Sequence, residues 1–220
     1  MKYLFTHLYT TISTHHKKIL IYLLGGILIG FIVLTLIVYF LPTSVIDKKF
    51  SDEVQEHQYP LLDIAMKIIS WPGSMPFSII MVLSTSLLLL LNRFKKEALY
   101  TLLSLLAGLI TYLIKIVINR PRPTENLVRI IEKAQYQSFP SGHVLFYVVF
   151  FGFVIVLMFQ LKTIQKTLRI VISGIAILLI FTIPFSRMYL GAHWFTDVAG
   201  GFLLGIITLY TLTYLYLKNG

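Results

Sequence analysis

The sequence predicts an all-α polytopic membrane protein with six transmembrane helices and an interfacial helix in the first outer loop. Of its 220 residues, 57% are hydrophobic and only 13% are charged. The apolar residues come in blocks close to the length of about 20 residues that a membrane-spanning helix needs. Between the blocks, we find no polar stretch long enough to fold separately in water. We therefore expect one integral-membrane domain over residues 1–220.

Six apolar blocks are the candidate spans, at residues 19–41, 76–91, 98–118, 144–161, 168–185 and 197–216. Cations precede the first block, as they do in a signal peptide. However, the run from Ile19 to Leu41 is longer than a signal core and lacks a small-residue cleavage site, so we interpret it as a retained first span. The block at 76–91 is short, and its limits are the least well defined.

The first outer loop, from Thr43 to Met75, alternates charged and apolar residues. Its later part, LLDIAMKIIS at residues 61–70, has apolar positions at helical spacing. This pattern predicts a helix lying in the membrane interface. Such a helix could be a lid or lateral gate for a lipid, or a plain connector resting on the headgroups.

Net charge and cysteine content exclude some classes of function. The formal net charge is +10, which in this chain indicates cationic loops at an anionic membrane surface rather than a nucleic-acid site. The absence of cysteine excludes disulfides, thiolate nucleophiles and zinc-thiolate sites, and leaves the redox compartment open.

The Lys and Arg residues of the loops bear on orientation. With a cytoplasmic N-terminus, ten of the 19 face inward and nine outward. Lys115, Arg122 and Arg187 have another use, described below, and the first outer loop is rich in acidic residues, namely Asp47, Asp52, Glu53, Glu56 and Asp63. We therefore expect both termini in the cytoplasm, with Arg120 among the ordinary outer-loop cations.

Three polar clusters interrupt the apolar chain, and this topology places them on one face. They are KIVINRPRP with Lys115 and Arg122, PSGH at residues 140–143, and SRMYLGAHWFTD at residues 186–197. Taken singly, each has a structural explanation. A lysine near a helix end can reach the headgroups, PSGH can be a turn before a helix, and His193 and Asp197 can form a structural hydrogen bond.

Together, the clusters favour a phosphate site, because ionisable groups near a bilayer boundary usually have a function. The cations Lys115, Arg122 and Arg187 match the three non-bridging oxygens of a phosphate. The backbone amides of Ser141 and Gly142, at the start of a helix, add donors for the same anion.

The two histidines can then share phosphoryl transfer. Asp197 follows His193 by four residues, so on a helix it can accept the Nδ1 proton and leave Nε2 free to attack phosphorus. His143 can protonate the leaving group as a general acid. Because the cations supply positive charge and no carboxylate cluster is evident, we expect no metal and no other cofactor.

The same residues resemble the signature of the type 2 phosphatidic acid phosphatase superfamily, K-x6-R-P, P-S-G-H and S-R-x5-H-x3-D. All three spacings match, over roughly the second half of the chain. Many members have proline two residues after the nucleophile, where this chain has Phe195. The resemblance implies the assignments already made: His143, His193 and Asp197 are catalytic, and Lys115, Arg122, Ser141, Gly142 and Arg187 bind phosphate.

The resemblance also implies a function. Size and layout are similar to small bacterial members that act on phosphatidylglycerophosphate or undecaprenyl pyrophosphate at the outer face of the plasma membrane; phosphatidic acid is a third candidate. The expected partners are the lipid phosphate and membrane lipids, with no obligatory protein partner. Two alternatives remain: a phosphotransferase that uses the same phosphohistidine, and a non-catalytic protein that binds or transports an anionic lipid.

Overall fold

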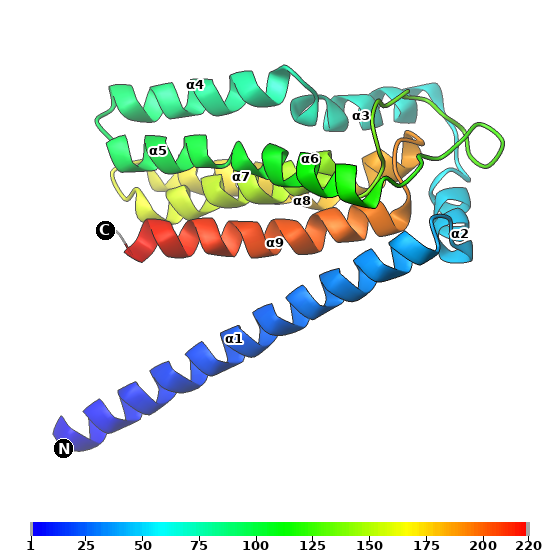
Figure 1. The fold of residues 1–220 in the computed structure, drawn as a ribbon. Coiled ribbons are helices and arrows are strands. Elements are labelled where there is room, and N and C mark those ends of the chain that lie inside the picture. The colour runs from blue at the N-terminus through cyan, green and yellow to red at the C-terminus, as the bar shows by residue number, and fades with distance from the viewer. Residues whose placement is uncertain (1, 219–220) are drawn as a thin grey trace.

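The structure, a computed structural model, describes the backbone of residues 2–218 and the side chains of residues 18–218. Lys2 and Lys17 are two of the ten cations assigned to the cytoplasmic side, and their side chains lie outside the described ones. Every regular element in the described part is a helix, which confirms the predicted fold class (Figure 1). The elements are α1 (Lys2–Phe40), α2 (Val45–Val54), α3 (Pro60–Ser70), the 3₁₀ helix η1 (Trp71–Gly73), α4 (Phe77–Leu91), α5 (Lys95–Leu103), α6 (Leu106–Ile118), α7 (Gly142–Gln160), α8 (Lys166–Tyr189) and α9 (Phe195–Lys218).

Five helical segments are long and apolar enough to cross a membrane, and a bent pair makes a possible sixth span. The five are Lys18–Phe40, Lys95–Ile118, Gly142–Gln160, Lys166–Tyr189 and Phe195–Lys218. The pair consists of Pro60–Gly73 and Phe77–Leu91, bent by 56° at the break between them. The helix predicted over residues 61–70 is therefore present as α3, but it continues into the bent second span.

Two spans differ from straight rods of the predicted length. The third is split into α5 and α6 at Ser104, a buried residue whose Oγ donates to the carbonyl of Thr101 at 2.6 Å. The fifth runs through Pro184 to Tyr189, beyond the predicted end at 185. Proline is tolerated inside membrane helices because neighbouring groups satisfy the freed carbonyl. The helix can therefore continue past Pro184 and beyond the end of the apolar block.

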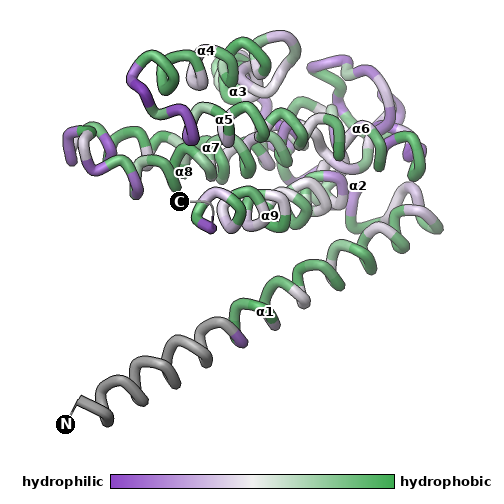
Figure 2. The backbone as a smooth tube through the Cα atoms, turned by 60° about the vertical axis from the view of Figure 1, so that its left-hand side comes forward, coloured by the Kyte–Doolittle hydropathy of each residue, from purple (hydrophilic) through white to green (hydrophobic). Residues whose placement is uncertain are grey.

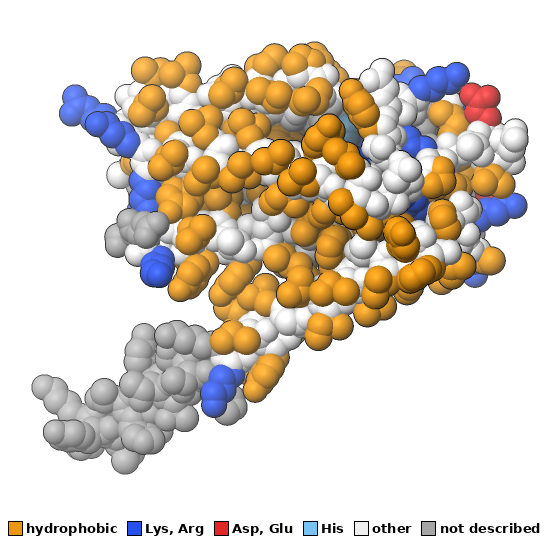
Figure 3. Space-filling model, in the orientation of Figure 1, with side chains coloured by type: hydrophobic (Ala, Val, Ile, Leu, Met, Phe, Trp, Pro, Cys, Tyr) orange, Lys and Arg blue, Asp and Glu red, His pale blue; other side chains and the backbone are white. Residues whose placement is uncertain are grey.

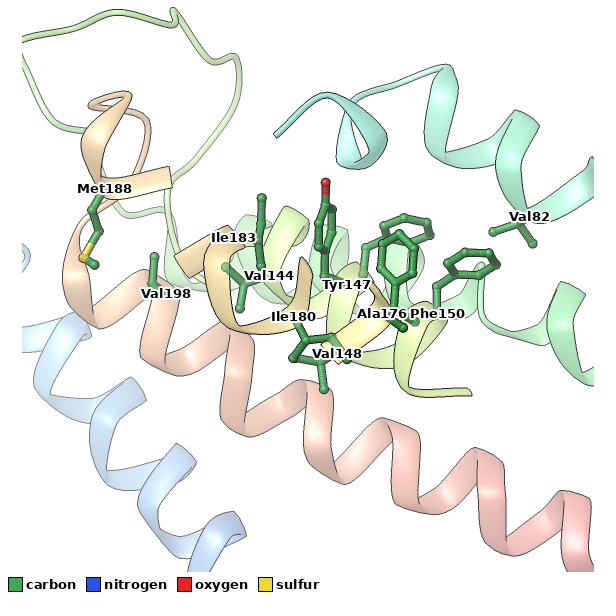
Figure 4. Packing of buried hydrophobic residues seen from close by; sticks show 12 residues of the cluster. Val82, Val144, Tyr147, Val148, Phe150, Ala176, Ile180, Ile183, Met188 and Val198 are labelled. Atoms are coloured by element: carbon green, nitrogen blue, oxygen red, sulfur yellow. The ribbon is translucent and has the colours of Figure 1, made fainter. Parts of the chain in front are cut away.

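Helix α7 is the centre of the bundle. In its span 61% of the residues are buried, against 6% in that of α1, and its apolar side chains pack between α8 and α9 (Figure 4). Glycines on α9 allow the close approach to α7. A Cβ at Gly201 would lie 2.6 Å from the backbone oxygen of Ser141, and one at Gly205 would lie 2.7 Å from Cβ of Val148. Small residues serve this purpose in membrane helix packing.

The outer surface fits a bilayer. Hydrophobic residues run along the helices, and hydrophilic ones gather at the turns between them (Figure 2). In space-filling view, hydrophobic side chains cover the middle of the visible face, and most of the Lys and Arg side chains lie toward its two ends (Figure 3). The start of α1 and the end of α9 lie at one end of the molecule in Figure 1, and the α8–α9 connection and α2 lie at the other.

Candidate active site

The predicted site residues meet at the end of the bundle away from the chain termini. Helices α6 and α8 run toward that end and bring Lys115 and Arg187 in their last turns. Helices α7 and α9 start there and bring His143 and Asp197 in their first turns. Alternating helix directions therefore place residues from four helices side by side (Figure 1).

Local backbone features position the three motifs. Helix α6 ends at Ile118 and is capped by Asn119, which has left-handed angles (φ 47°, ψ 39°) and donates its N–H to the carbonyl of Lys115 at 2.9 Å. Asparagine tolerates this conformation at a helix end. Gly191 has φ +69°, and a Cβ there would lie 2.3 Å from the backbone oxygen of Arg129, so this turn requires glycine. The amide of Ser141 donates to the carbonyl of Asp197 at 2.9 Å, which joins the start of α7 to α9.

The three predicted phosphate-binding cations are held by oxygen atoms around the site. Lys115 Nζ donates to the carbonyl oxygens of Gln137 and Ser138, the second at 3.1 Å. Arg122 Nη1 donates to the carbonyl of Ala192 at 2.6 Å and lies 3.3 Å from His193 Nε2. Burial, followed by the nearby charge of Arg187, lowers the pKa of Arg122 to about 10, which leaves its guanidinium charged at neutral pH.

Arg187 is the most enclosed of the three cations, with 1% of its surface exposed. Its Nη1 donates to the hydroxyl of Ser70 and to Glu132 Oε1, the latter at 2.9 Å. Ser70 ends α3, and η1 follows it directly. A Cβ at Gly73 of η1 would lie 2.6 Å from Cδ2 of His143. The end of α3 and η1 therefore form one wall of the site.

Three buried polar atoms of the predicted site residues have no hydrogen-bond partner among the described residues: Ser141 Oγ, His143 Nε2 and Arg187 Nε. Buried polar groups without a partner are rare and costly, and such groups commonly indicate a missing ion, ligand or water. Two of these atoms are N–H or O–H donors and the third belongs to a titratable ring. With the cations of Lys115 and Arg122 beside them, they form a site suited to a multivalent anion.

His193 and Asp197 form the predicted pair, with a long separation. His193 Nδ1 lies 3.4 Å from Asp197 Oδ2, and both residues are almost fully buried. An arginine can only donate hydrogen bonds, so the contact of Arg122 with Nε2 requires that nitrogen to be unprotonated and places the proton on Nδ1. Burial first, then the charges of Arg122 and Lys115, lower the pKa of His193 well below its ordinary value. The ring is therefore neutral, with Nε2 unprotonated and facing Arg122.

Several residues near the site were not predicted from the sequence. Ser138 is fully buried and donates its hydroxyl to Asp197 Oδ2, and Glu132 and Ser70 contact Arg187. Arg120 was assigned to the ordinary outer-loop charges, and this was wrong. It is 2% exposed and pairs with Asp197 at 2.5 Å and with Asp47 at 2.6 Å. Nothing in the RPRP sequence indicated which of its two arginines is enclosed by the protein and which lies beside His193.

A cavity of about 400 Å³ opens beside Arg122. Its lining includes Glu132, Lys133, Gly191 and Ala192. Among residues 18–218, no group of three or more His, Asp or Glu side chains could hold a metal ion. The cavity adjoins the site on the side of Arg122 and Ala192.

Comparison with known proteins finds a family model and a curated relative that match part of the chain. A family model described as PAP2 superfamily matches residues 96–220. Phosphatidylglycerophosphatase B of Bacillus subtilis (strain 168) is 33% identical over 106 residues, which are 46% of this chain and 49% of that protein. The alignment therefore spans about half the length of this curated relative.

Two crystal structures share the fold. A transmembrane PAP2-type phosphatidylglycerolphosphate phosphatase from Bacillus subtilis has a TM-score of 0.78 and 23% identity, over 90% of this chain and 97% of that one. Aquifex aeolicus LpxE has a TM-score of 0.59 and 22% identity, over 81% of this chain and 98% of that one. Both are similar in fold to the chain described above.

Proposed function

Because this chain belongs to the PAP2 superfamily, we propose that it is an integral-membrane lipid phosphatase that uses a phosphohistidine intermediate. The observation that carries the proposal is the group of unpaired buried polar atoms on Ser141, His143 and Arg187, set beside the cations of Lys115 and Arg122. A phosphate bound there would satisfy all three atoms. It would also lie next to the lone pair of His193 Nε2.

In the first step, His193 Nε2 attacks phosphorus. A nitrogen–phosphorus bond forms as the bond to the leaving oxygen breaks, and His143 gives that oxygen a proton. His193 then carries the phosphoryl group on Nε2 and a proton on Nδ1, and its positive charge faces Asp197. In the second step, His143 takes a proton from water as the water oxygen attacks phosphorus. The nitrogen–phosphorus bond breaks, and inorganic phosphate leaves with His193 neutral again.

The cations supply the electrostatic part of catalysis in this proposal. Lys115, Arg122 and Arg187 neutralise the non-bridging oxygens, whose charge rises and shifts in the transition state. Ser141 Oγ and the amides at Gly142, the first residue of α7, donate to the same oxygens. With these groups in place, we propose that hydrolysis requires no metal ion.

The position of the site supports a lipid substrate. The site lies where four apolar helices begin or end, so a phosphate head can reach His193 while its lipid chain stays among the helices. The name of the curated relative, phosphatidylglycerophosphatase B, makes phosphatidylglycerophosphate the first candidate. Undecaprenyl pyrophosphate and phosphatidic acid present the same terminal phosphate and are the other two.

We propose that the protein lies in the plasma membrane with this site at the outer face and the termini in the cytoplasm. Support comes from the start of α1 and the end of α9, which lie at the end of the bundle opposite the site (Figure 1). The sidedness itself can be tested by labelling single cysteines placed at exposed Glu56 and Lys162 with a membrane-impermeant thiol reagent. The chain contains no other cysteine, so labelling at position 56 alone supports the proposed orientation.

The test of function is phosphate release by the detergent-purified protein in EDTA, from the three candidate lipids side by side. We expect release that survives EDTA and falls on the order of 10⁴-fold in His193→Ala. His57→Ala is the matched control, because His57 is an exposed histidine of the first outer loop. Activity in His193→Ala equal to wild type would contradict the mechanism. No release from any lipid by folded wild-type protein would contradict the function.

A further inference from the structure

Asp197 of the proposed catalytic pair belongs to a row of three buried charged side chains, Asp47, Arg120 and Asp197. Arg120 Nη2 contacts Asp47 Oδ2 at 2.6 Å, and Arg120 Nη1 contacts Asp197 Oδ1 at 2.5 Å. Asp47 and Asp197 have no exposed surface, and Arg120 has 2%. Burial of three ionised groups is costly, and it is tolerated only where geometry and hydrogen bonds compensate.

The hydrogen bonds of this group are nearly complete. Arg120 Nε donates to the carbonyl of Pro42 at 2.8 Å, and Nη1 also donates to Thr196 Oγ1 at 2.7 Å. Asp47 Oδ1 accepts the amide of Thr196 at 2.9 Å, at the start of α9. Asp47 also forms the capping box of its own helix with Ser44. One carboxylate thus ties α2 to the helix that carries Asp197.

Arg120 fixes which oxygen of Asp197 serves His193. Oδ1 is taken by Arg120, while Oδ2 faces His193 Nδ1 and also accepts the amide of Trp194 at 2.9 Å and the hydroxyl of Ser138. With both oxygens engaged, the carboxylate cannot rotate. The imidazole is therefore aligned by groups from three separate parts of the chain.

We propose that Arg120 and Asp47 are positioning residues that act through Asp197 on the charge and orientation of the nucleophile His193. This inference rests on the proposed function and extends it to the first outer loop, which supplies Asp47. Arg120 alone would cancel the negative charge of Asp197. With Asp47 on its other side, the three groups sum to one negative charge, which faces the positive charge that His193 gains with the phosphoryl group.

The two residues act on His193 in opposite directions. Loss of the Arg120 charge leaves Asp197 without a cation and removes one positive charge near the imidazole of His193. The His193–Asp197 pair then binds a proton more readily. Loss of the Asp47 charge leaves Arg120 less neutralised, so the pair binds a proton less readily. The charged and titratable groups around His193 are Lys115, Arg120, Arg122, His143, Arg187 and Asp197, with Asp47 behind Arg120 and Glu132 behind Arg187.

The experiment compares pH profiles of kcat/KM for wild type, Arg120→Gln, Asp47→Asn and the double variant. We expect kcat to fall roughly 10- to 100-fold in each single variant, as for a displaced catalytic group, with KM changed less than about threefold. The acid limb should move to higher pH in Arg120→Gln and to lower pH in Asp47→Asn. The two shifts should partly cancel in the double variant.

Arg129→Gln is the matched control. Arg129 forms the other ion pair between the first outer loop and the segment that follows α6, with Asp63 at 2.7 Å, and its side chain is 40% exposed. It should leave kcat and the acid limb unchanged. If Arg120→Gln does not fold, because it leaves two buried carboxylates without a cation, the downward shift in Asp47→Asn still decides the proposal.

Two results would overturn the inference. A raised KM with unchanged kcat would make Arg120 a substrate ligand, and lower kcat with a stationary acid limb in both variants would make the ion pairs merely structural. If the proposed function is wrong, the result is different, because the wild-type protein then releases no phosphate. In that case, NMR titration of ¹⁵N-labelled His193 still tests the inference, since opposite shifts of its titration midpoint support it and equal midpoints refute it.

Discussion

A single methyl group added at Gly73 is expected to slow turnover while the protein stays folded. Gly73 ends η1 and packs against α7. Its added Cβ would lie 2.6 Å from Cδ2 of His143 and 2.8 Å from Cε2 of Tyr147. Carbon atoms in ordinary contact are about 3.5–4.0 Å apart. One partner must therefore move by about 1 Å.

Every way of relieving this contact disturbs the site. If the imidazole moves, the proton donor His143 leaves its position. If η1 moves instead, the preceding residues Ile69 and Ser70 move with it. This disturbs the hydrogen bond from Arg187 to the hydroxyl of Ser70 and the one from the hydroxyl of Tyr147 to the carbonyl of Ile69. Tyr147 is fully buried and points toward α3 (Figure 4). A misplacement of about 1 Å can cost about 10²-fold in rate, which is the loss expected in Gly73→Ala.

The assay is phosphate release in detergent, with thermal unfolding as the check on folding. Gly174→Ala is the control, since a Cβ at Gly174 of α8 meets no described heavy atom within 4 Å. Alanine is the better helix former, so this control should be as active as wild type and at least as stable. Wild-type turnover by folded Gly73→Ala would refute the reasoning, because it would show that η1 does not set the position of His143 or that turnover does not need it.

Three further predictions concern the phosphate ligands, the pH dependence of the rate and the pH dependence of stability. Arg122→Gln should raise KM and the inhibition constant of inorganic phosphate by about 10- to 100-fold, the usual range for a charged hydrogen bond, and Arg129→Gln should change neither. The rate should follow a bell-shaped pH profile, with an acid limb below pH about 6.5 because burial and Arg122 lower the pKa of His193. His193 binds a proton more readily in the unfolded protein than in the folded one. The neutral ring therefore contributes to folding stability above pH about 6.5, and this contribution is lost as the pH falls toward the folded-state pKa. Melting temperatures of wild type and His193→Gln, measured across this pH range, would detect the loss. A flat profile, or equal melting shifts in the two proteins, would contradict the assignment of His193.

The helical fold and the proposed catalytic residues could be predicted because both depend on local patterns. Apolar blocks of span length can be counted along the chain, and in lipid a helix satisfies its own backbone. The PSGH turn places His143 at the start of α7. His193 lies in the bend before α9 and not on the helix that its spacing to Asp197 predicted, yet it still faces Asp197 in the first turn of α9. In both cases the partners lie within a few residues of one another.

The break and the bend in the spans could not be predicted from hydropathy. The third span is interrupted at Ser104, which packs in the core and bonds within its own turn. The second begins as the amphipathic α3 and bends by 56° before α4. Hydropathy measures how well a segment is solvated by lipid, whereas its path depends on which neighbours it packs against.

Arg120 and Arg122 show most clearly where sequence reasoning ends. They are two residues apart in the same RPRP repeat, yet Arg122 lies beside His193, and Arg120 is enclosed between Asp47 and Asp197. Asp47 lies 149 residues before its partner Thr196. The sequence by itself determined the helices, the motifs and the chemistry that their residue types allow. Only the tertiary structure decided which loop charges are buried and paired, because ion pairing in a membrane protein depends on contacts between segments that no spacing along the chain encodes.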